Sequence, residues 1–221
     1  MDRRFYVMNE SVFEQSLAPE EIATRYASID IEVDSIDPAA GQIVAIGIGL
    51  KDTIAGEQTI DVLTLGGALG DEGTMIRRAF ERINEFDPNA LVTYNGEAFD
   101  LDYLSKRIQA LQFRQQPELN CAKNHVDLFV PRKRSADEAG VKWPSLEEVL
   151  ETHGLTVQPT IWCGEKLTNS LFGEQLAPEY IDAIAEDRTM AVDELEGIIH
   201  QYVCGDIESN IALYETDAGR R

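Results

Sequence analysis

The sequence predicts an α/β fold in which a mixed central sheet is flanked by helices. Strand patterns fill the first third of the chain, and strands and helices alternate after that, which is the order expected for this class. The 221 residues suit one domain, and a hydrophobic content of 43% is enough to bury a core. No repeat, low-complexity tract or linker divides the chain, so we expect a single domain over residues 1–221.

Three strands are expected in the N-terminal part of the chain. Residues 28–34 (SIDIEVD) alternate with a period of two, and residues 42–50 (QIVAIGIGL) are sufficiently apolar and β-branched for a central strand. A turn at residues 37–41 separates these segments, and residues 59–65 are expected to form the third strand.

Helices are expected from residue 72 onward. Apolar residues recur at helical spacing over residues 72–86, and Asp87-Pro88 ends that helix. A short apolar strand at residues 90–94 precedes a helix that begins near Ala98. The remaining helices are expected at residues 146–150, 179–185 and 192–214. Residues 112–144 are expected to be irregular, apart from residues 125–130.

The chain is strongly acidic and poor in lysine. Its formal net charge is −21, its pI is about 4.4, and its nineteen basic residues comprise thirteen Arg and six Lys. Such a surface suits a salt-rich cytoplasm, where ions screen the self-repulsion, so we expect a halophilic source; an acidic mesophilic protein is the alternative. Because the net charge repels phosphates, any role with nucleic acid must depend on a specific site.

Signals for secretion, membrane insertion and disulfide bonding are missing from the sequence. No segment has the length of a signal-peptide core or of a membrane span, so we expect a soluble, cytoplasmic protein with no membrane association. Cys121, Cys163 and Cys204 are widely spaced and include no Cys-x-x-Cys pair. This spacing argues against a disulfide framework and against a structural zinc site.

Asp30 and Glu32 are the first candidates for chemistry. They lie two residues apart in a predicted strand, so their side chains share one face while Ile29, Ile31 and Val33 fill the other. Neighbouring carboxylates repel each other unless a cation holds them, and Mg²⁺ and Mn²⁺ prefer carboxylate oxygen. The alternative is an edge strand with a solvated acidic face. A calcium loop is excluded, because its essential glycine and its bidentate glutamate are missing.

A second cluster comprises Asn95, Phe99 and Asp100. It lies where the strand at residues 90–94 meets the following helix. The first turn of a helix tolerates anions, because its free N–H groups point outward. Taken alone, Asp100 is equally explained as a first-turn acid that favours the helix dipole.

A third cluster comprises Tyr202 and Asp206 in the last helix. Leu195, Ile199 and Tyr202 form an apolar stripe at spacings of four and three residues. Asp206 follows Tyr202 by four residues, so its carboxylate is expected on the same core-facing stripe. A carboxylate on a buried stripe is costly unless it is paired or bound to a metal. Taken alone, Tyr202 is more simply explained as a core aromatic residue.

Together, these clusters resemble the exonuclease motifs of the DEDD superfamily, tyrosine subtype (DEDDy). The pattern is Asp30-x-Glu32, then Asn95-x-x-x-Phe99-Asp100, then Tyr202-x-x-x-Asp206. The surrounding residues are most similar to the 3′–5′ proofreading exonuclease domain of B-family DNA polymerases, over about residues 26–215. The resemblance implies an RNase H-like fold, and the core of this domain would comprise about residues 26–215. Because 221 residues leave no room for a polymerase, we expect a free-standing exonuclease, from a halophilic archaeon.

The resemblance implies a site for two divalent ions, Mg²⁺ or Mn²⁺. Asp30, Glu32 and Asp206 would bind one ion, and Asp30 would bridge to a second that Asp100 helps to hold. Such ions lie ~3.5–4 Å apart and stabilise both the entering and the leaving oxygen. Tyr202 would orient the attacking water, since a phenol with an ordinary pKa of about 10 is a poor base at neutral pH.

The resemblance also implies contacts with nucleic acid. Asn95 and Phe99 would touch the terminal nucleotides, with a core position as the alternative for Phe99. Independently of the resemblance, Arg132 and Lys133, together with Arg134, form the densest basic cluster of the sequence, with Lys142 and Trp143 nearby. This cluster could hold the backbone of a single strand, and a solvated loop is the alternative.

The implied function is hydrolysis of phosphodiester bonds at the 3′ end of single-stranded DNA, in proofreading or repair. One alternative is a 3′–5′ exoribonuclease, because no motif identifies a reader of the 2′-hydroxyl. Another is a non-catalytic nucleic-acid-binding module with the same fold. A replication or repair partner is compatible with this function, but the sequence does not identify one.

Overall fold

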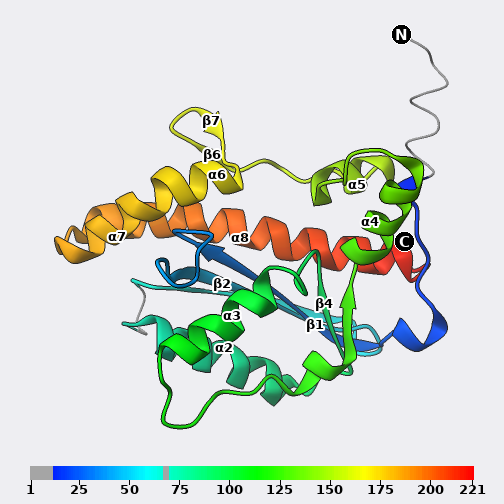
Figure 1. Cartoon of the computed structure of the whole chain (residues 1–221), viewed down its shortest axis with the longest axis horizontal. Coiled ribbons are helices and arrows are strands. Elements are labelled where there is room, and N and C mark those ends of the chain that lie inside the picture. The colour runs from blue at the N-terminus through cyan, green and yellow to red at the C-terminus, as the bar shows by residue number, and fades with distance from the viewer. Residues whose placement is uncertain (1–11, 67–69) are drawn as a thin grey trace.

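The fold is organised around a five-stranded sheet. A computed structural model describes residues 12–66 and 70–221 (Figure 1). The strands lie in the order β3-β2-β1-β4-β5; neighbours among β1, β2 and β3 are antiparallel, whereas β4 and β5 run parallel to β1. Their bounds are β1 Arg25–Val33, β2 Ile43–Asp52, β3 Glu57–Thr64, β4 Ala90–Thr93 and β5 His125–Asp127. The predicted mixed sheet is confirmed, and β1 is its middle strand.

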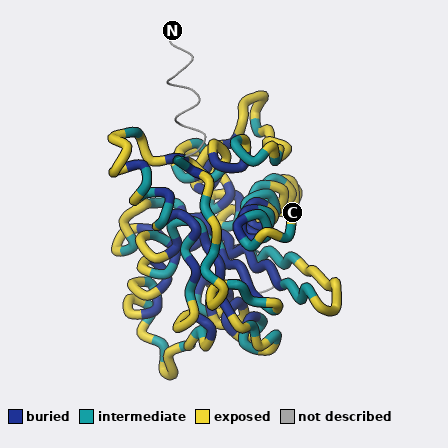
Figure 2. The backbone as a smooth tube through the Cα atoms, turned by 90° about the vertical axis from the view of Figure 1, so that its right-hand side faces the viewer, coloured by how far each residue is buried: buried dark blue, intermediate teal, exposed yellow. Residues whose placement is uncertain are grey.

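Helices cover both faces of the sheet. On one face lie α2 (Glu72–Phe86) and α3 (Asp100–Ala110). The long α8 (Thr189–Asp217) crosses the other face, accompanied by α5 (Leu146–Thr152) and α7 (Ala177–Ala185) (Figure 1). Figure 2 shows the buried strands in the interior and the exposed residues on the outer turns and loops. The helices predicted at residues 72–86, 146–150, 179–185 and 192–214 are confirmed.

The alternation along β1 sorts its side chains between the two layers. Ile29, Ile31 and Val33 join the core beneath α2 and α3, whereas Asp30 and Glu32 face α8. β1 pairs with a strand on each side, and most of its residues are buried. The alternative of a solvated edge strand is therefore excluded.

Two glycines of β2 allow α8 to lie close to the sheet. Gly47 pairs with Asp30 across the ladder between β1 and β2. A Cβ atom at Gly47 would lie 2.5 Å from Cγ1 of Val203, and one at Gly49 would lie 2.6 Å from Cγ2 of Ile207. Both distances are well below the optimal carbon–carbon separation of about 3.5–4.0 Å. The missing side chains therefore allow α8 to approach the sheet closely at β2.

Residues 112–144 are not irregular, so this expectation from the sequence is wrong. The short helix η2 (Asn120–Asn124), β5 and α4 (Phe129–Ala139) occupy much of the segment. The buried residues of α4 are Phe129, Arg132 and Ala136, so an arginine interrupts the apolar pattern by which a helix is recognised. Gly140 ends α4 with a φ of 65°, a left-handed conformation that favours glycine.

The other ordered segments connect the main elements. A hairpin of β6 (Ile161–Trp162) and β7 (Glu165–Lys166) precedes α6 (Asn169–Leu171), and the π-helical turn η3 (Phe172–Leu176) leads into α7. A 3-10 turn, η1 (Pro19–Glu21), precedes β1. None of the helices in the two described ranges is long and apolar enough to cross a membrane.

Candidate active site

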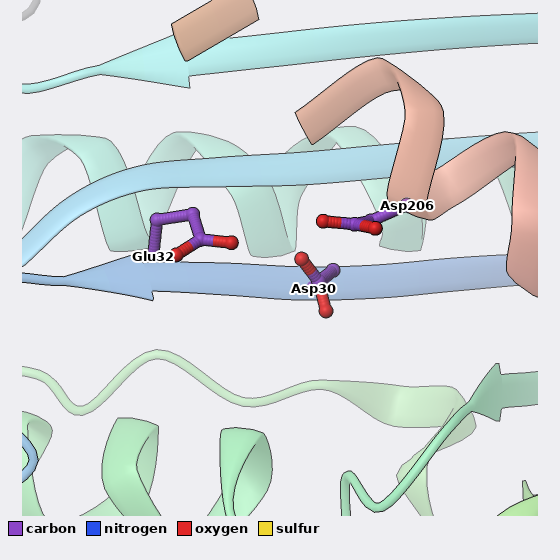
Figure 3. Close-up of side chains that lie close together, drawn as sticks. All are labelled: Asp30, Glu32 and Asp206. Carbon is purple, nitrogen blue, oxygen red and sulfur yellow. The ribbon is translucent and has the colours of Figure 1, made fainter. Parts of the chain in front are cut away.

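Three carboxylates from distant parts of the chain converge above the middle of the sheet. Asp30 and Glu32 rise from β1, and Asp206 extends toward them from α8 (Figure 3). One oxygen from each of the three side chains lies within 4.8 Å of the other two. Hard divalent cations bind several carboxylate oxygens at once, so this set of donors fits such an ion.

Burial perturbs the ionisation of these carboxylates. Desolvation raises the pKa of Asp30 and of Glu32 well above the usual range, and the charges of Asp100 and Asp206 add to the effect. Desolvation also raises the pKa of Asp206 to about 7, and Glu147 contributes further. Within the described ranges, no Lys or Arg forms an ion pair with Asp30, Glu32, Asp100 or Asp206. Buried carboxylates without a counter-charge are costly, and a metal ion would supply one.

Asp100 adjoins this cluster from the first turn of α3. Its Oδ1 accepts a hydrogen bond of 3.0 Å from the amide of Ile31, which joins α3 to β1. The side chain is buried, and desolvation raises its pKa to about 7 although the amide hydrogen bonds oppose the shift. Its charge raises the pKa of Asp30. Asp100 lies outside the group of three oxygens within 4.8 Å, and it lines the same cleft.

Tyr202 lies on α8 and lines this cleft as well. Its hydroxyl donates a hydrogen bond of 2.7 Å to Oδ1 of Asn169, and its ring stacks on Phe172 with centroids 5.7 Å apart. Burial raises the pKa of Tyr202, and the charge of Glu32 raises it further. The phenol therefore remains protonated at neutral pH, and its single proton is directed at Asn169. Only the lone pairs of the hydroxyl are left to accept a hydrogen bond in the cleft.

The loop between β4 and α3 carries Asn95 and Phe99, which both line the cleft. Asn95 has a left-handed φ of 68°, a conformation that asparagine tolerates. Asp127 holds the loop by accepting hydrogen bonds from the amides of Asn95 (2.8 Å) and Glu97 (3.0 Å). Phe99 also packs on Tyr103, with ring centroids 5.9 Å apart, so it combines a cleft position with the core contacts of the alternative interpretation.

The cleft has a volume of about 1000 Å³. Its walls come from β1, the β4–α3 loop, the segments around α5 and α6, and α8. Lys166 of β7 and Glu147 of α5 form an ion pair on its wall, and Glu147 acts electrostatically on Asp206. No motif or periodic pattern in the sequence singled out Glu147, Lys166 or Asn169, because only the fold brings them to the carboxylates.

Arg132 is not available to nucleic acid, so its assignment as a substrate-binding residue is wrong. Its side chain is fully buried and makes hydrogen bonds of 2.8 and 2.7 Å to the carboxylate of Asp217, which join α4 to α8. Consecutive helical residues point about 100° apart, so residues 132–134 do not share one surface. Lys133 instead lies over the ring of Trp143, with its Nζ 4.1 Å from the centroid.

Known proteins resemble this chain in sequence and in fold. The family described as "DNA polymerase family B, exonuclease domain" matches residues 5–136, a range that contains Asp30, Glu32 and Asp100 and ends before Tyr202. The structure of the family B DNA polymerase from the hyperthermophilic archaeon Pyrobaculum calidifontis is similar with a TM-score of 0.59 and 24% identity, over 87% of this chain and 24% of that chain. This structural similarity supports the RNase H-like fold.

Short stretches of sequence are also similar to DNA polymerases. DNA polymerase 1 of Pyrococcus abyssi is 25% identical over 118 residues, which cover 53% of this chain and 15% of that protein. A DNA polymerase of Pyrococcus glycovorans is 46% identical over 43 residues, or 20% of this chain and 6% of that protein. The chain thus spans only a small part of these relatives. Because the family match covers more than half of its residues, the chain belongs to the exonuclease-domain family of family B DNA polymerases.

Proposed function

We propose that this chain is a metal-dependent 3′–5′ exonuclease that removes nucleotides from the 3′ end of single-stranded DNA. Membership of the exonuclease-domain family indicates 3′–5′ exonuclease activity. The observation that carries the proposal is the convergence of Asp30, Glu32 and Asp206 within 4.8 Å, in a cleft large enough for a nucleotide chain. We propose two divalent ions, Mg²⁺ or Mn²⁺, as cofactors.

The four carboxylates are proposed to hold these ions. Asp30, Glu32 and Asp206 would bind one ion, and Asp30 and Asp100 would bind the second. When bound, such ions lower the pKa of a water molecule and neutralise charge on the reacting phosphate. Without counter-charge the four carboxylates would repel a phosphodiester, so their coordination also removes a barrier to substrate binding.

Tyr202 is proposed to orient the attacking water, as in the tyrosine subtype. Because its O–H donates a hydrogen bond to Asn169, the hydroxyl has its lone pairs left and can accept a hydrogen bond from water. Its raised pKa disfavours the phenolate, so we assign it a positioning role in place of proton abstraction.

Asn95 and Phe99 are proposed to contact the terminal nucleotides, and Lys133 to lie near the backbone. The positions of Asn95 and Phe99 on one wall of the cleft, close in sequence to Asp100, support this assignment. An aromatic ring stacks on any base, which suits an enzyme that acts without sequence preference.

The proposal is tested with single-stranded DNA that carries a 5′ label. We expect a ladder of products shortened from the 3′ end in Mg²⁺ or Mn²⁺, and no products in EDTA. Activity should be greater at high than at low KCl concentration, because salt screens the repulsion between the acidic chain and DNA. A matched RNA strand in parallel identifies an exoribonuclease. Failure of the wild-type protein to shorten either strand with added metal would contradict the proposal.

Substitutions locate the activity in the proposed site. Asp30→Ala should lower kcat at least about 100-fold, because metal-bound charge stabilisation contributes several kcal/mol. Asp193→Ala is the matched control, since Asp193 is an exposed carboxylate of α8 that does not line the cleft. Wild-type turnover by Asp30→Ala would show that the metal ligands are assigned incorrectly.

A further inference from the structure

Trp143 is a large aromatic residue that lines the same cleft as the carboxylates and has no role in the reaction proposed above. It is 47% exposed, although aromatic side chains of this size are on average highly buried. The residue lies between α4 and α5, whereas the carboxylates come from β1, α3 and α8. An exposed indole therefore stands on a wall of the cleft separate from the proposed metal site.

Three contacts fix the orientation of this indole. Its Nε1 donates a hydrogen bond of 2.7 Å to Asp137, and its ring packs against the ring of Phe129 with an interplanar angle of 80° and centroids 6.1 Å apart. Lys133 lies over the ring. Phe129 also packs against the ring of Tyr94, with ring centroids 5.3 Å apart. Because Tyr94, Phe129 and Trp143 all line the cleft, they form a continuous aromatic wall.

We propose that Trp143 and Lys133 form a binding subsite for one unpaired nucleotide of the DNA strand, on the 5′ side of the nucleotide that is removed. The base would stack on the exposed part of the indole, and the adjoining phosphate would lie near the ammonium group of Lys133. The subsite rests on the proposed exonuclease function. A strand whose 3′ end lies at the carboxylates continues only in the 5′ direction, so a wall away from them meets upstream nucleotides.

Two physical arguments favour a nucleotide as the occupant. A base gains stacking energy on a rigid, preoriented aromatic ring, and the gain does not depend on the base's identity. In addition, no carboxylate in the described part of the chain forms an ion pair with Lys133, and the Asp137 carboxylate beside the same indole accepts its Nε1–H, so the ammonium group can still act on a phosphate. In a chain with a net charge of −21, a cation that lies over an aromatic ring of the cleft wall favours binding of a polyanion beside that ring.

The subsite is tested with two substrates of different length. The p-nitrophenyl ester of thymidine 5′-monophosphate has a single nucleoside, whereas an oligothymidylate of about ten residues is long enough to reach an upstream subsite. Trp143→Ala should raise KM for the oligonucleotide about tenfold, leave its kcat nearly unchanged, and leave hydrolysis of the small ester unchanged. Trp143→Phe, which keeps an aromatic ring, should restore most of the loss. Trp162→Ala is the matched control, because Trp162 does not line the cleft.

The outcomes separate the subsite from the proposed function. If Trp143→Ala has the wild-type KM for both substrates, the subsite is overturned. An equal loss of kcat/KM on both substrates would overturn it too, because Trp143 would then merely support the fold. A wild-type protein that hydrolyses neither substrate in the presence of metal contradicts the proposed function instead.

A binding measurement tests the subsite without hydrolysis. The chain has two tryptophans, so in Trp162→Phe the fluorescence comes from Trp143 alone. We expect saturable quenching by a phosphorothioate oligothymidylate, which resists hydrolysis, and weaker affinity after the additional change Lys133→Ala. Absence of quenching at concentrations that saturate the enzyme would overturn the subsite, whatever the activity.

Discussion

At the scale of single residues, the hydrogen bond to Asn169 orients the hydroxyl group of Tyr202. Oδ1 of Asn169 accepts a hydrogen bond of 2.7 Å from the phenol hydroxyl, whose lone pairs remain able to accept a hydrogen bond from water. We expect Asn169→Ala to lower kcat about two- to tenfold, the effect of one hydrogen bond worth about 0.5–1.5 kcal/mol, with little change in KM. Tyr202→Phe should lower kcat further, because it removes the hydroxyl itself.

A double-mutant cycle distinguishes this role from a structural one. If Asn169 acts through the hydroxyl, adding Asn169→Ala to Tyr202→Phe should cause no further loss of kcat. Ser170→Ala, a change at the next residue of the cleft wall, should have no effect in either background. Additive losses from Asn169→Ala and Tyr202→Phe would mean that Asn169 supports the cleft independently of the phenol.

Local spacing explains which site residues the sequence revealed. Asp30 and Glu32 share a face because a strand has a period of two, and Tyr202 and Asp206 share a side because four residues make about one helical turn. Asn169 reaches Tyr202 only through the packing of α6 beside α8, and no local pattern encodes that contact. The same limit applied to Arg132, whose partner Asp217 lies 85 residues away.

At the scale of elements, Gly47 sets the separation between β2 and α8. A methyl group there would lie 2.5 Å from Val203 and 2.8 Å from Ile207, two stiff β-branched side chains of α8, so we expect Gly47→Ala to push α8 outward and with it Asp206. We expect a loss of about 1–3 kcal/mol in the free energy of unfolding, the usual cost of overpacking, together with lower kcat and weaker metal affinity. Denaturant unfolding and metal titration measure these effects.

Gly197→Ala provides the control for this change. Gly197 lies within α8, and an added Cβ would have no neighbour within 4 Å. Replacement of a helical glycine by alanine should therefore raise stability by about 1 kcal/mol and leave metal affinity unchanged. Equal metal affinity in Gly47→Ala and the wild type would show that the position of Asp206 does not depend on this close approach.

The buried ion pair of Arg132 and Asp217 joins α4 to α8. Arg132→Met should destabilise the protein by about 3–5 kcal/mol, because it leaves the Asp217 carboxylate buried without a partner. For a chain of this size that loss lowers Tm by about 6–20 °C, whereas Lys133→Ala should change stability by no more than about 0.5 kcal/mol. Weaker DNA binding by Arg132→Met, with unchanged Tm, would instead favour the surface role first expected for this residue.

At the scale of the whole molecule, the sequence predicted the sheet and most helices, but it did not predict several short segments beside the cleft. Periodic patterns identified β1 and α2, and the continuous apolar run of β2 identified a central strand that is buried on both faces. The hairpin of β6 and β7, α4 and the turn η3 have short or interrupted patterns, and contacts with distant elements stabilise them. These same segments carry Lys166, which lines the cleft and pairs with Glu147, and Lys133, which lies over the ring of Trp143 on the cleft wall.

The buried carboxylates make the stability of the whole protein depend on pH and metal together. The pKa values of Asp100 and Asp206 are about 7 in the folded protein, against about 3.9 for an unperturbed aspartate. The folded state therefore binds more protons than the unfolded state, and its stability in EDTA should fall as the pH rises from about 4 to 7. The lowered pKa values of Asp71 and Glu148 act in the opposite sense, but only in more acidic solution.

Thermal unfolding at pH 5.5 and pH 8, in EDTA and in Mn²⁺, measures this linkage. A bound cation favours the charged carboxylates, so the rise in Tm on adding Mn²⁺ should be larger at pH 8 than at pH 5.5; each 1 kcal/mol corresponds to about 2–4 °C. Asp206→Asn removes one buried charge and one ligand, so it should raise Tm in EDTA at pH 8 and reduce the gain from Mn²⁺. If Mn²⁺ stabilises Asp206→Asn as much as the wild type, the ion binds elsewhere, because loss of a ligand from the cluster must weaken its hold on a cation.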